Sequence, residues 1–147
     1  MRRADRLWML SVAFAATAWT APAEACTIGA VGVNFGAYDP RSATAADGTG
    51  SVTLNCPKNT KTASVSISTG GSGSYAQRRM TSGSSVLNYN LHTNASRTTI
   101  WGNGSGGTAT ITVGDGSTTL PIYGRIPTRQ NVRAGTYSDT TTITVTF

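Results

Sequence analysis

The sequence offers few side chains from which a catalytic centre could be built. Its one histidine, His92, lies in the stretch "NLHTN", where we expect a polar residue at the end of a strand rather than a general base. Neither a pair of carboxylates nor a nucleophile beside a base emerges from the pattern. We therefore expect no enzyme, no catalytic residue and no cofactor. The carboxylates beyond the N-terminal leader are Asp39, Asp47, Asp115 and Asp139, of which the first three stand in Asp-Pro or Asp-Gly turn pairs.

Two cysteines, Cys26 and Cys56, lie 30 positions apart. An even count in an exported chain most simply predicts one disulfide, which the chain-entropy account values at about 3–4 kcal/mol for such a loop. A metal site is the weaker interpretation, because two cysteines, one histidine and few carboxylates show no ligand spacing. The glycine-rich stretches "GNGSGG" and "GDGS" lack the lysine and the following helix of a phosphate-binding loop. We expect no metal and no bound nucleotide.

The N-terminus predicts export. A basic start, "MRRADR", precedes an apolar run over residues 7–19, and "APAEA" then places Ala23 and Ala25 at the positions of a cleavage site. We expect a signal peptide over residues 1–25 and a mature domain over residues 26–147, found in the periplasm in transit and then outside the cell or on its surface. The apolar run is short for a membrane span, so no membrane insertion is expected after cleavage. A lipoprotein signal is the alternative, since Cys26 would be the first mature residue, but Ala23 and Glu24 fit it poorly.

The mature region alternates apolar and polar residues in short stretches separated by Gly, Asn, Asp and Pro, which is typical of strands and turns. In the first stretch we expect Val31, Val33 and Phe35 on one face. Short helical turns are expected at most over residues 72–77 and 94–99. Together the pattern predicts an all-β fold, an immunoglobulin-like antiparallel β-sandwich. The expected strands lie within residues 28–38, 50–56, 62–68, 85–93, 107–113, 118–126 and 137–147.

The last stretch, "YSDTTTITVTF", raises a question about how the sheet is closed. From Tyr137 onward the odd positions end in Ile143, Val145 and Phe147, whereas the even positions from Thr136 are all Ser or Thr. One face of this strand must therefore be covered and the other wetted. The sequence stops at Phe147, with no turn and no partner strand behind it.

Charged and aromatic residues indicate no further class of ligand. The formal net charge is +6, but the basic residues are scattered singly apart from Arg78-Arg79, so we expect no nucleic-acid partner. Four aromatic residues offer a sugar-stacking surface as an alternative to a role in the core, and three arginines near one connection offer an anion site as an alternative to a solvated loop. These are Trp101, Tyr75, Tyr38 and Tyr123, and Arg125, Arg129 and Arg133.

Several spaced motifs resemble those of one family. "ACTIGAVGVNFGAYDP", "GSVTLNC", "YAQRRM", "LNYNLHTNASRTTIWGNG", "YGRIP" and the ending "GTYSDTTTITVTF" are similar to stretches of spore coat protein U domains, across essentially all of residues 26–147. Members of this family are, or resemble, subunits of archaic chaperone–usher pili or of spore coats. The resemblance implies a secreted structural subunit of a surface fimbria or coat. The alternative is a self-contained secreted coat or carbohydrate-binding protein that needs no chaperone.

The resemblance also implies an answer to the question of the last strand. Subunits of this type have an immunoglobulin-like fold that lacks its final strand, which a partner supplies by donor-strand complementation. The implied partners are a periplasmic chaperone, an outer-membrane usher and neighbouring pilus subunits. A missing strand leaves an unpaired edge and an open groove. We expect Ile143, Val145 and Phe147 to lie beside that groove and to contact the chaperone or the donor strand.

One departure from the family pattern bears on polarity. A donor extension needs about ten extended residues with alternating apolar side chains ahead of Cys26. Cleavage after Ala25 would leave none, and cleavage after Ala18 would leave only "WTAPAEA", which contains Pro22 and Glu24. We therefore expect a subunit that accepts a strand without donating one, at a terminal position in the filament.

Overall fold

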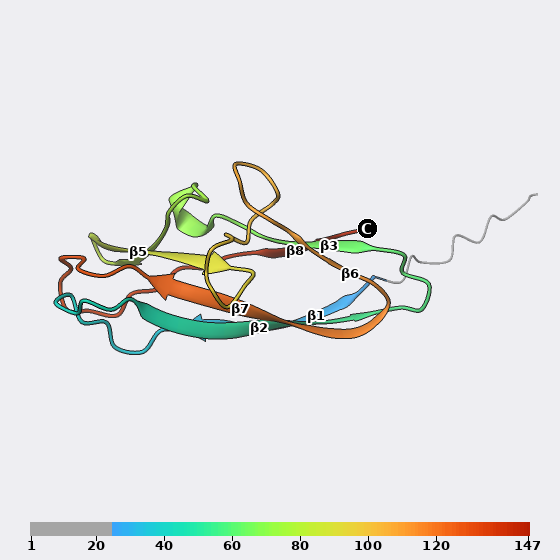
Figure 1. Ribbon diagram of the computed structural model, residues 1–147, viewed down its shortest axis with the longest axis horizontal. Coiled ribbons are helices and arrows are strands. Elements are labelled where there is room, and N and C mark those ends of the chain that lie inside the picture. The colour runs from blue at the N-terminus through green and yellow to red at the C-terminus, as the bar shows by residue number, and fades with distance from the viewer. Residues whose placement is uncertain (1–24) are drawn as a thin grey trace, which may run out of the picture.

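The computed structural model describes residues 25–147, and this region is all-β and antiparallel, as predicted (Figure 1). The predicted signal peptide lies outside the described residues, apart from Ala25. Within residues 25–147, no helix is long and apolar enough to cross a membrane. The elements are β1 (Thr27–Asn34), β2 (Ala46–Cys56), β3 (Ala63–Ile67), the 3-10 turn η1 (Gly70–Ser72), β4 (Arg78–Ser82), β5 (Ser85–His92), β6 (Ile111–Val113), β7 (Gly116–Ile126) and β8 (Ile143–Thr146).

The strands form two sheets that pack face to face. One has five strands in the order β1-β2-β7-β5-β4, and the other has three in the order β6-β3-β8. In Figure 1, β3 and β8 run along one side of the molecule and β1 and β2 along the other. The longest pairing in the larger sheet joins β2 to β7. It runs from Ala46 opposite Ile126 to Cys56 opposite Gly116.

Alternation in the sequence becomes alternation in burial. In β2, Val52 and Leu54 are fully buried while Thr53 and Asn55 are exposed, and β3 buries Ala63, Val65 and Ile67. The inward residues of the two sheets meet in one core. This is the period-2 pattern of strands with one wet face, so the predicted sandwich is confirmed by its burial as well as by its pairing.

Two local predictions were wrong, and one strand was missed. A bulge between Val31 and Asn34 breaks the first strand, so Val33 and Phe35 pack against the core but Val31 is 65% exposed. The helical turn falls at Gly70–Ser72 instead of residues 72–77 or 94–99. Strand β4 went unrecognised, because its first residues are two arginines.

The last strand is shorter than expected, although its alternation holds. Only Ile143–Thr146 pairs in β8, while Ser138 makes an isolated bridge to Thr81 in β4. Odd positions from Tyr137 to Val145 are nevertheless half-buried and the even ones exposed. The stretch before β8 crosses from the larger sheet to the smaller one, which is why one continuous strand cannot form.

On one flank the chain joins the two sheets itself. The amide of Trp101 donates to the Leu91 carbonyl in β5, and the carbonyl of Gly102 accepts from the Ile67 amide in β3. The Trp101 ring is fully buried, and its indole N–H donates to the Val65 carbonyl at 3.0 Å. Arg78, also fully buried, donates to the carbonyls of Ser68 and Trp101, among others. We call this side, defined by Trp101 and Arg78, the closed flank.

Candidate functional site: an open groove between two strand edges

The opposite flank is bounded by two strands with free edges. Among residues 25–147, β1 pairs with β2 alone and β8 with β3 alone. Each edge therefore carries backbone N–H and C=O groups that no other strand satisfies. We call this side, between β1 and β8, the open flank.

Exposure of apolar side chains marks the open flank as uncovered. Ile28 of β1 stands directly opposite Leu54 of β2, on the same face of the sheet, yet Ile28 is 46% exposed whereas Leu54 is fully buried. In the smaller sheet, Val145 is only half-buried although its cross-strand partner Val65 is fully buried. At both edges of this flank, the side chains of the edge strand are therefore less buried than those of the neighbouring inner strand.

A groove follows this flank in two connected hollows, of about 380 and 960 Å³. The smaller runs from β1 to the stretch before β8 over a floor of inward residues from three strands. The larger continues past the loop after β1 to the loop before Tyr137. The two share the residues Gly32, Val33, Phe35, Met80 and Tyr137. Together they make a trough lined mostly by apolar side chains and open to solvent, suited to an extended apolar segment.

Glycines in the larger sheet allow the groove to take this shape. A Cβ on Gly124 would lie 2.6 Å from the Phe35 ring and 2.7 Å from Val33, and one on Gly50 would lie 2.5 Å from the Val31 carbonyl oxygen. The residues around the β1 bulge therefore lie directly on the sheet backbone. Phe35 also meets Tyr89 edge-to-face, with 5.9 Å between ring centroids.

A polar cluster forms part of the groove wall. The Tyr89 hydroxyl donates to Asp139 at 2.7 Å, and the other carboxylate oxygen accepts from the Gly71 and Thr140 amides, both at 2.9 Å. Burial, together with the bond to Asp139, raises the pKa of Tyr89 well above its usual value, so this phenol remains a donor throughout the neutral range. Sequence reasoning missed this cluster, because a single aspartate carries no spacing signal.

The predicted partner-binding residues occupy different depths. Ile143 lines the smaller hollow, and Val145 is half-buried against the edge of the core. Phe147 is 65% exposed, one residue beyond the end of β8. The structure therefore places Ile143 in the lining of the groove, Val145 at the edge of the core and Phe147 on the surface.

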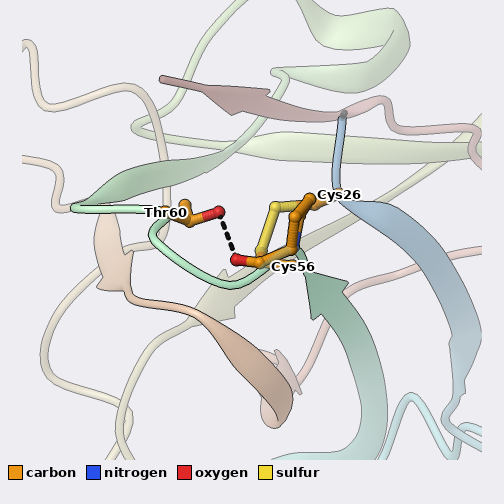
Figure 2. The surroundings of a disulfide bond; sticks show 4 residues. Cys26, Cys56 and Thr60 are labelled. Atoms are coloured by element: carbon orange, nitrogen blue, oxygen red, sulfur yellow. Dashed lines mark hydrogen bonds between the residues drawn. A yellow bond between two sulfur atoms is a disulfide. The ribbon is translucent and has the colours of Figure 1, made fainter. Parts of the chain in front are cut away.

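The disulfide predicted between Cys26 and Cys56 is present (Figure 2). It joins the residue before β1 to the last residue of β2, with the Cα atoms 4.1 Å apart. The Thr60 hydroxyl donates to the Pro57 carbonyl at 2.8 Å in the turn that follows. This cross-link ties the free edge strand β1 to the sheet at one end, close to the start of the open flank.

Two of the ionisable residues considered as catalytic candidates, His92 and Asp47, make structural hydrogen bonds and ion pairs away from the groove. His92 ends β5, as expected, but it is buried rather than at a polar edge, and its Nδ1 lies 3.1 Å from the Tyr123 carbonyl oxygen. Its pKa is lowered by burial and by nearby arginines. Asp47 is paired with Arg125 at 2.7 Å and with Arg97 at 3.4 Å. Within residues 25–147, no group of three His, Cys, Asp or Glu side chains is placed to hold a metal ion.

The aromatic residues do not make the alternative sugar platform as a set. Trp101 is fully buried, and the Tyr38 hydroxyl is tied to the Pro127 carbonyl and the Gln130 amide. Tyr75 lies under the Arg78 guanidinium and Tyr123 under that of Arg97. A stacking surface that relies on Trp101 is therefore excluded in this conformation.

Comparison with known proteins agrees with the motifs. Residues 11–144 match the model of the Spore Coat Protein U domain family. The chain belongs to this family. "Protein U" of Myxococcus xanthus is 38% identical over 141 residues, which cover 84% of this chain and 78% of that protein. The family is one of structural pilus and coat domains and is not an enzyme class.

A solved structure shares the fold of this Spore Coat Protein U domain. It is the complex of CsuC and CsuE, described as a chaperone–tip adhesion subunit pre-assembly complex from the archaic chaperone–usher Csu pili of Acinetobacter baumannii. The TM-score is 0.60 at 27% identity, covering 84% of this chain. The match spans 39% of the solved chain, so the described domain corresponds to less than half of that protein's length.

Proposed function

We propose that this domain is an exported structural subunit of a chaperone–usher surface fimbria or coat, and that it accepts a donor strand in the groove between β1 and β8. The observation that carries the proposal is the fall in burial at both edges of one flank: Ile28 and Val145 stay exposed or half-exposed beside fully buried Leu54 and Val65. An added strand would pair with the free edges and cover these side chains. The partners would be a periplasmic chaperone, an outer-membrane usher and neighbouring subunits.

The apolar surface of the groove favours a domain that binds a partner over one that is stable by itself. The groove exposes apolar side chains from both sheets, and water contact costs roughly 25 cal/mol for each Å² of apolar surface. Covering even two half-exposed aliphatic side chains would therefore stabilise the domain by about 1–3 kcal/mol before any backbone pairing is counted. An uncovered edge of this kind also invites aggregation. The mature domain is expected to aggregate when it is expressed alone.

Peptide complementation tests the proposal. Mature protein, residues 26–147, is refolded with a soluble peptide in which valine and threonine alternate over ten residues between terminal lysines. The matched control has the same composition in blocks of two, which cannot place all valines on one face. The alternating peptide should yield a monodisperse complex with a cooperative thermal transition. A monodisperse domain that melts cooperatively and ignores both peptides would refute strand acceptance and favour the self-contained alternative.

We also propose that three residues of the last strand and its end contact the donor strand or the chaperone. Ile143, in the groove, and Val145, at the edge of the core, would pack against the donor side chains, and Phe147 would contact a chaperone. The exposure of Phe147 leaves it accessible for such a contact. Deleting Phe147 should then weaken capture by a chaperone while leaving peptide complementation unchanged.

A terminal position in the filament is also proposed. Cys26 is held in the disulfide next to β1, so any donor segment would have to precede it. Cleavage after Ala25 would leave no such segment. Purified complexes of this subunit should cap the N-terminal segment of a neighbouring subunit and stop growth, as electron microscopy would show. Long homopolymers of this subunit alone would contradict it.

A further inference from the structure

Asp139 lies where the chain passes between the two sheets. Ser138 is bridged to Thr81 in β4 by two backbone hydrogen bonds of 3.0 and 3.2 Å. Thr142 is joined to Ser68, just after β3, by a backbone bond of 2.9 Å and by its amide to the Ser68 hydroxyl at 2.8 Å. Residues 139–141 span the gap between these anchors and line the smaller hollow of the groove.

The carboxylate of Asp139 gathers donors from three directions. Tyr89 reaches it from β5, Gly71 from η1, and Thr140 from the spanning stretch itself, at 2.7–2.9 Å. Hydrogen bonds to a charged acceptor are about twice as strong as neutral ones. The carboxylate therefore links the spanning stretch to both the groove floor and the 3-10 turn.

The turn is shaped to receive this carboxylate. Gly70 has φ +64, a left-handed conformation, and a Cβ there would overlap the Asp139 carboxylate. A residue with a side chain would be strained by its backbone and would also displace the aspartate. The close approach of η1 thus depends on glycine at this position.

We propose that Asp139 is a positioning residue, which holds residues 139–141 as a pre-formed wall of the groove so that an incoming strand meets an ordered surface. This inference rests on the proposed strand-acceptor function. A wall that is ordered before binding spares the complex the entropy of ordering it, and the saving appears mainly in the rate of association. The same bonds persist after binding, so the rate of dissociation changes little.

The test starts from the mature domain complemented by a shorter, weakly bound valine–threonine peptide. Association and dissociation of the alternating ten-residue peptide, which carries a dye and is added in excess, are then followed by stopped-flow fluorescence. Asp139→Ala removes every bond, Asp139→Asn keeps one carbonyl oxygen for the two amides, and Tyr89→Phe removes only the phenol donor. Asp115→Ala, in an exposed turn, and Tyr123→Phe, on the outer face of the larger sheet, are the matched controls.

Asp139→Ala should slow association about tenfold, equivalent to about 1.4 kcal/mol, with dissociation within about threefold of wild type. Asp139→Asn and Tyr89→Phe should fall between it and the controls, which should match wild type. Hydrogen exchange of the Gly71 and Thr140 amides should accelerate in the alanine variant. Tyr89→Phe keeps the apolar core and tests the same link if the alanine variant does not fold.

Two results overturn the inference while leaving strand acceptance intact. Either the variants associate as fast as wild type, or association and dissociation change equally, in which case the carboxylate stabilises the whole fold rather than the free groove. Failure of wild type to bind the alternating peptide would overturn strand acceptance and this inference together.

Discussion

The two flanks of this sandwich differ in how the two sheets are joined. On the closed flank, the chain itself links the sheets through Trp101 and Gly102, and Arg78 fills the remaining space with donors to backbone carbonyls. On the open flank, no strand within residues 25–147 pairs with the outer edges of β1 and β8, and apolar side chains remain exposed. The contrast shows that incomplete closure is confined to one side and is not a property of a weakly packed domain.

The closed flank also shows what satisfying a buried charge requires. Arg78 is fully buried, and within residues 25–147 no carboxylate forms a salt bridge with it. Instead, its donors meet the carbonyls of Ile67, Ser68 and Trp101 and the side-chain oxygen of Asn90. Such a network stabilises only when it is complete. On the open flank the unpaired groups are backbone groups, which a single added strand could satisfy at once.

Replacing Trp101, which joins the two sheets on the closed flank, should have the largest effect on stability. Trp101→Ala deletes a fully buried ring and its bond to the Val65 carbonyl, so the peptide-complemented domain should lose about 3–5 kcal/mol of unfolding free energy in urea. Trp101→Phe, which keeps much of the volume, should lose less. If Trp101→Ala left the urea midpoint unchanged, the two flanks would not differ as described, because the ring would not be what joins the sheets.

A charged side chain on the open flank should abolish binding of the donor peptide without unfolding the domain. Val145→Lys would place an unpaired charge in the seam with the donor strand, and burying it costs several kcal/mol. Peptide affinity should fall at least a hundredfold, which is about 2.7 kcal/mol, by fluorescence titration. Thr144→Lys, on the exposed face of the same strand, is the matched control and should bind normally. Equal losses in both variants would argue that β8 does not face the groove through Val145.

Alternation of apolar residues carried most of what the sequence could predict. It located β2, β3, β5 and β7, because each has one inward and one outward face, and it gave the half-buried face of Ile143 and Val145. The even cysteine count predicted the disulfide. These are local or pairwise signals, which a single sequence retains.

Features that depend on three-dimensional neighbours could not be predicted in this way. Arg78 reads as a surface residue until the carbonyls around it are known, so β4 was missed. Val31 was placed on the inner face because a bulge leaves no mark in the period-2 pattern. Asp139 is one polar residue in a Thr-rich stretch, and its role rests on Tyr89 and Gly71, which are far from it in sequence.

The disulfide tests how firmly the edge strand β1 must be held. Replacing Cys26 and Cys56 by serine should lower the unfolding free energy of the complemented domain by about 2–4 kcal/mol, since the cross-link constrains the unfolded chain. Peptide affinity should fall as well, because β1 is one wall of the groove. Intact-mass analysis of exported protein is the accompanying check. A start at Cys26 with two hydrogens fewer than the dithiol is expected, whereas a diacylglyceryl adduct on Cys26 would refute the predicted signal cleavage.

The smallest expected effect concerns pH and belongs to the larger sheet, away from the groove. Burial and the charges of Arg125, Arg97 and Arg78 lower the pKa of His92 below its ordinary 6.5. Below pH 6.5, His92 therefore binds a proton more readily in the unfolded chain than in the folded one. The free energy of unfolding is highest above pH 6.5 and declines as the pH falls below it. Urea unfolding of the complemented domain from pH 8 to pH 5 should show this decline, and His92→Gln should remove it.

Asp47, whose pKa is lowered chiefly by its hydrogen bond to Arg125, loses its contribution to stability only below about pH 3.8, outside that range. If His92→Gln kept the full pH dependence, a different group would have to titrate, and peptide affinity measured over the same range would show whether that group lies on the open flank.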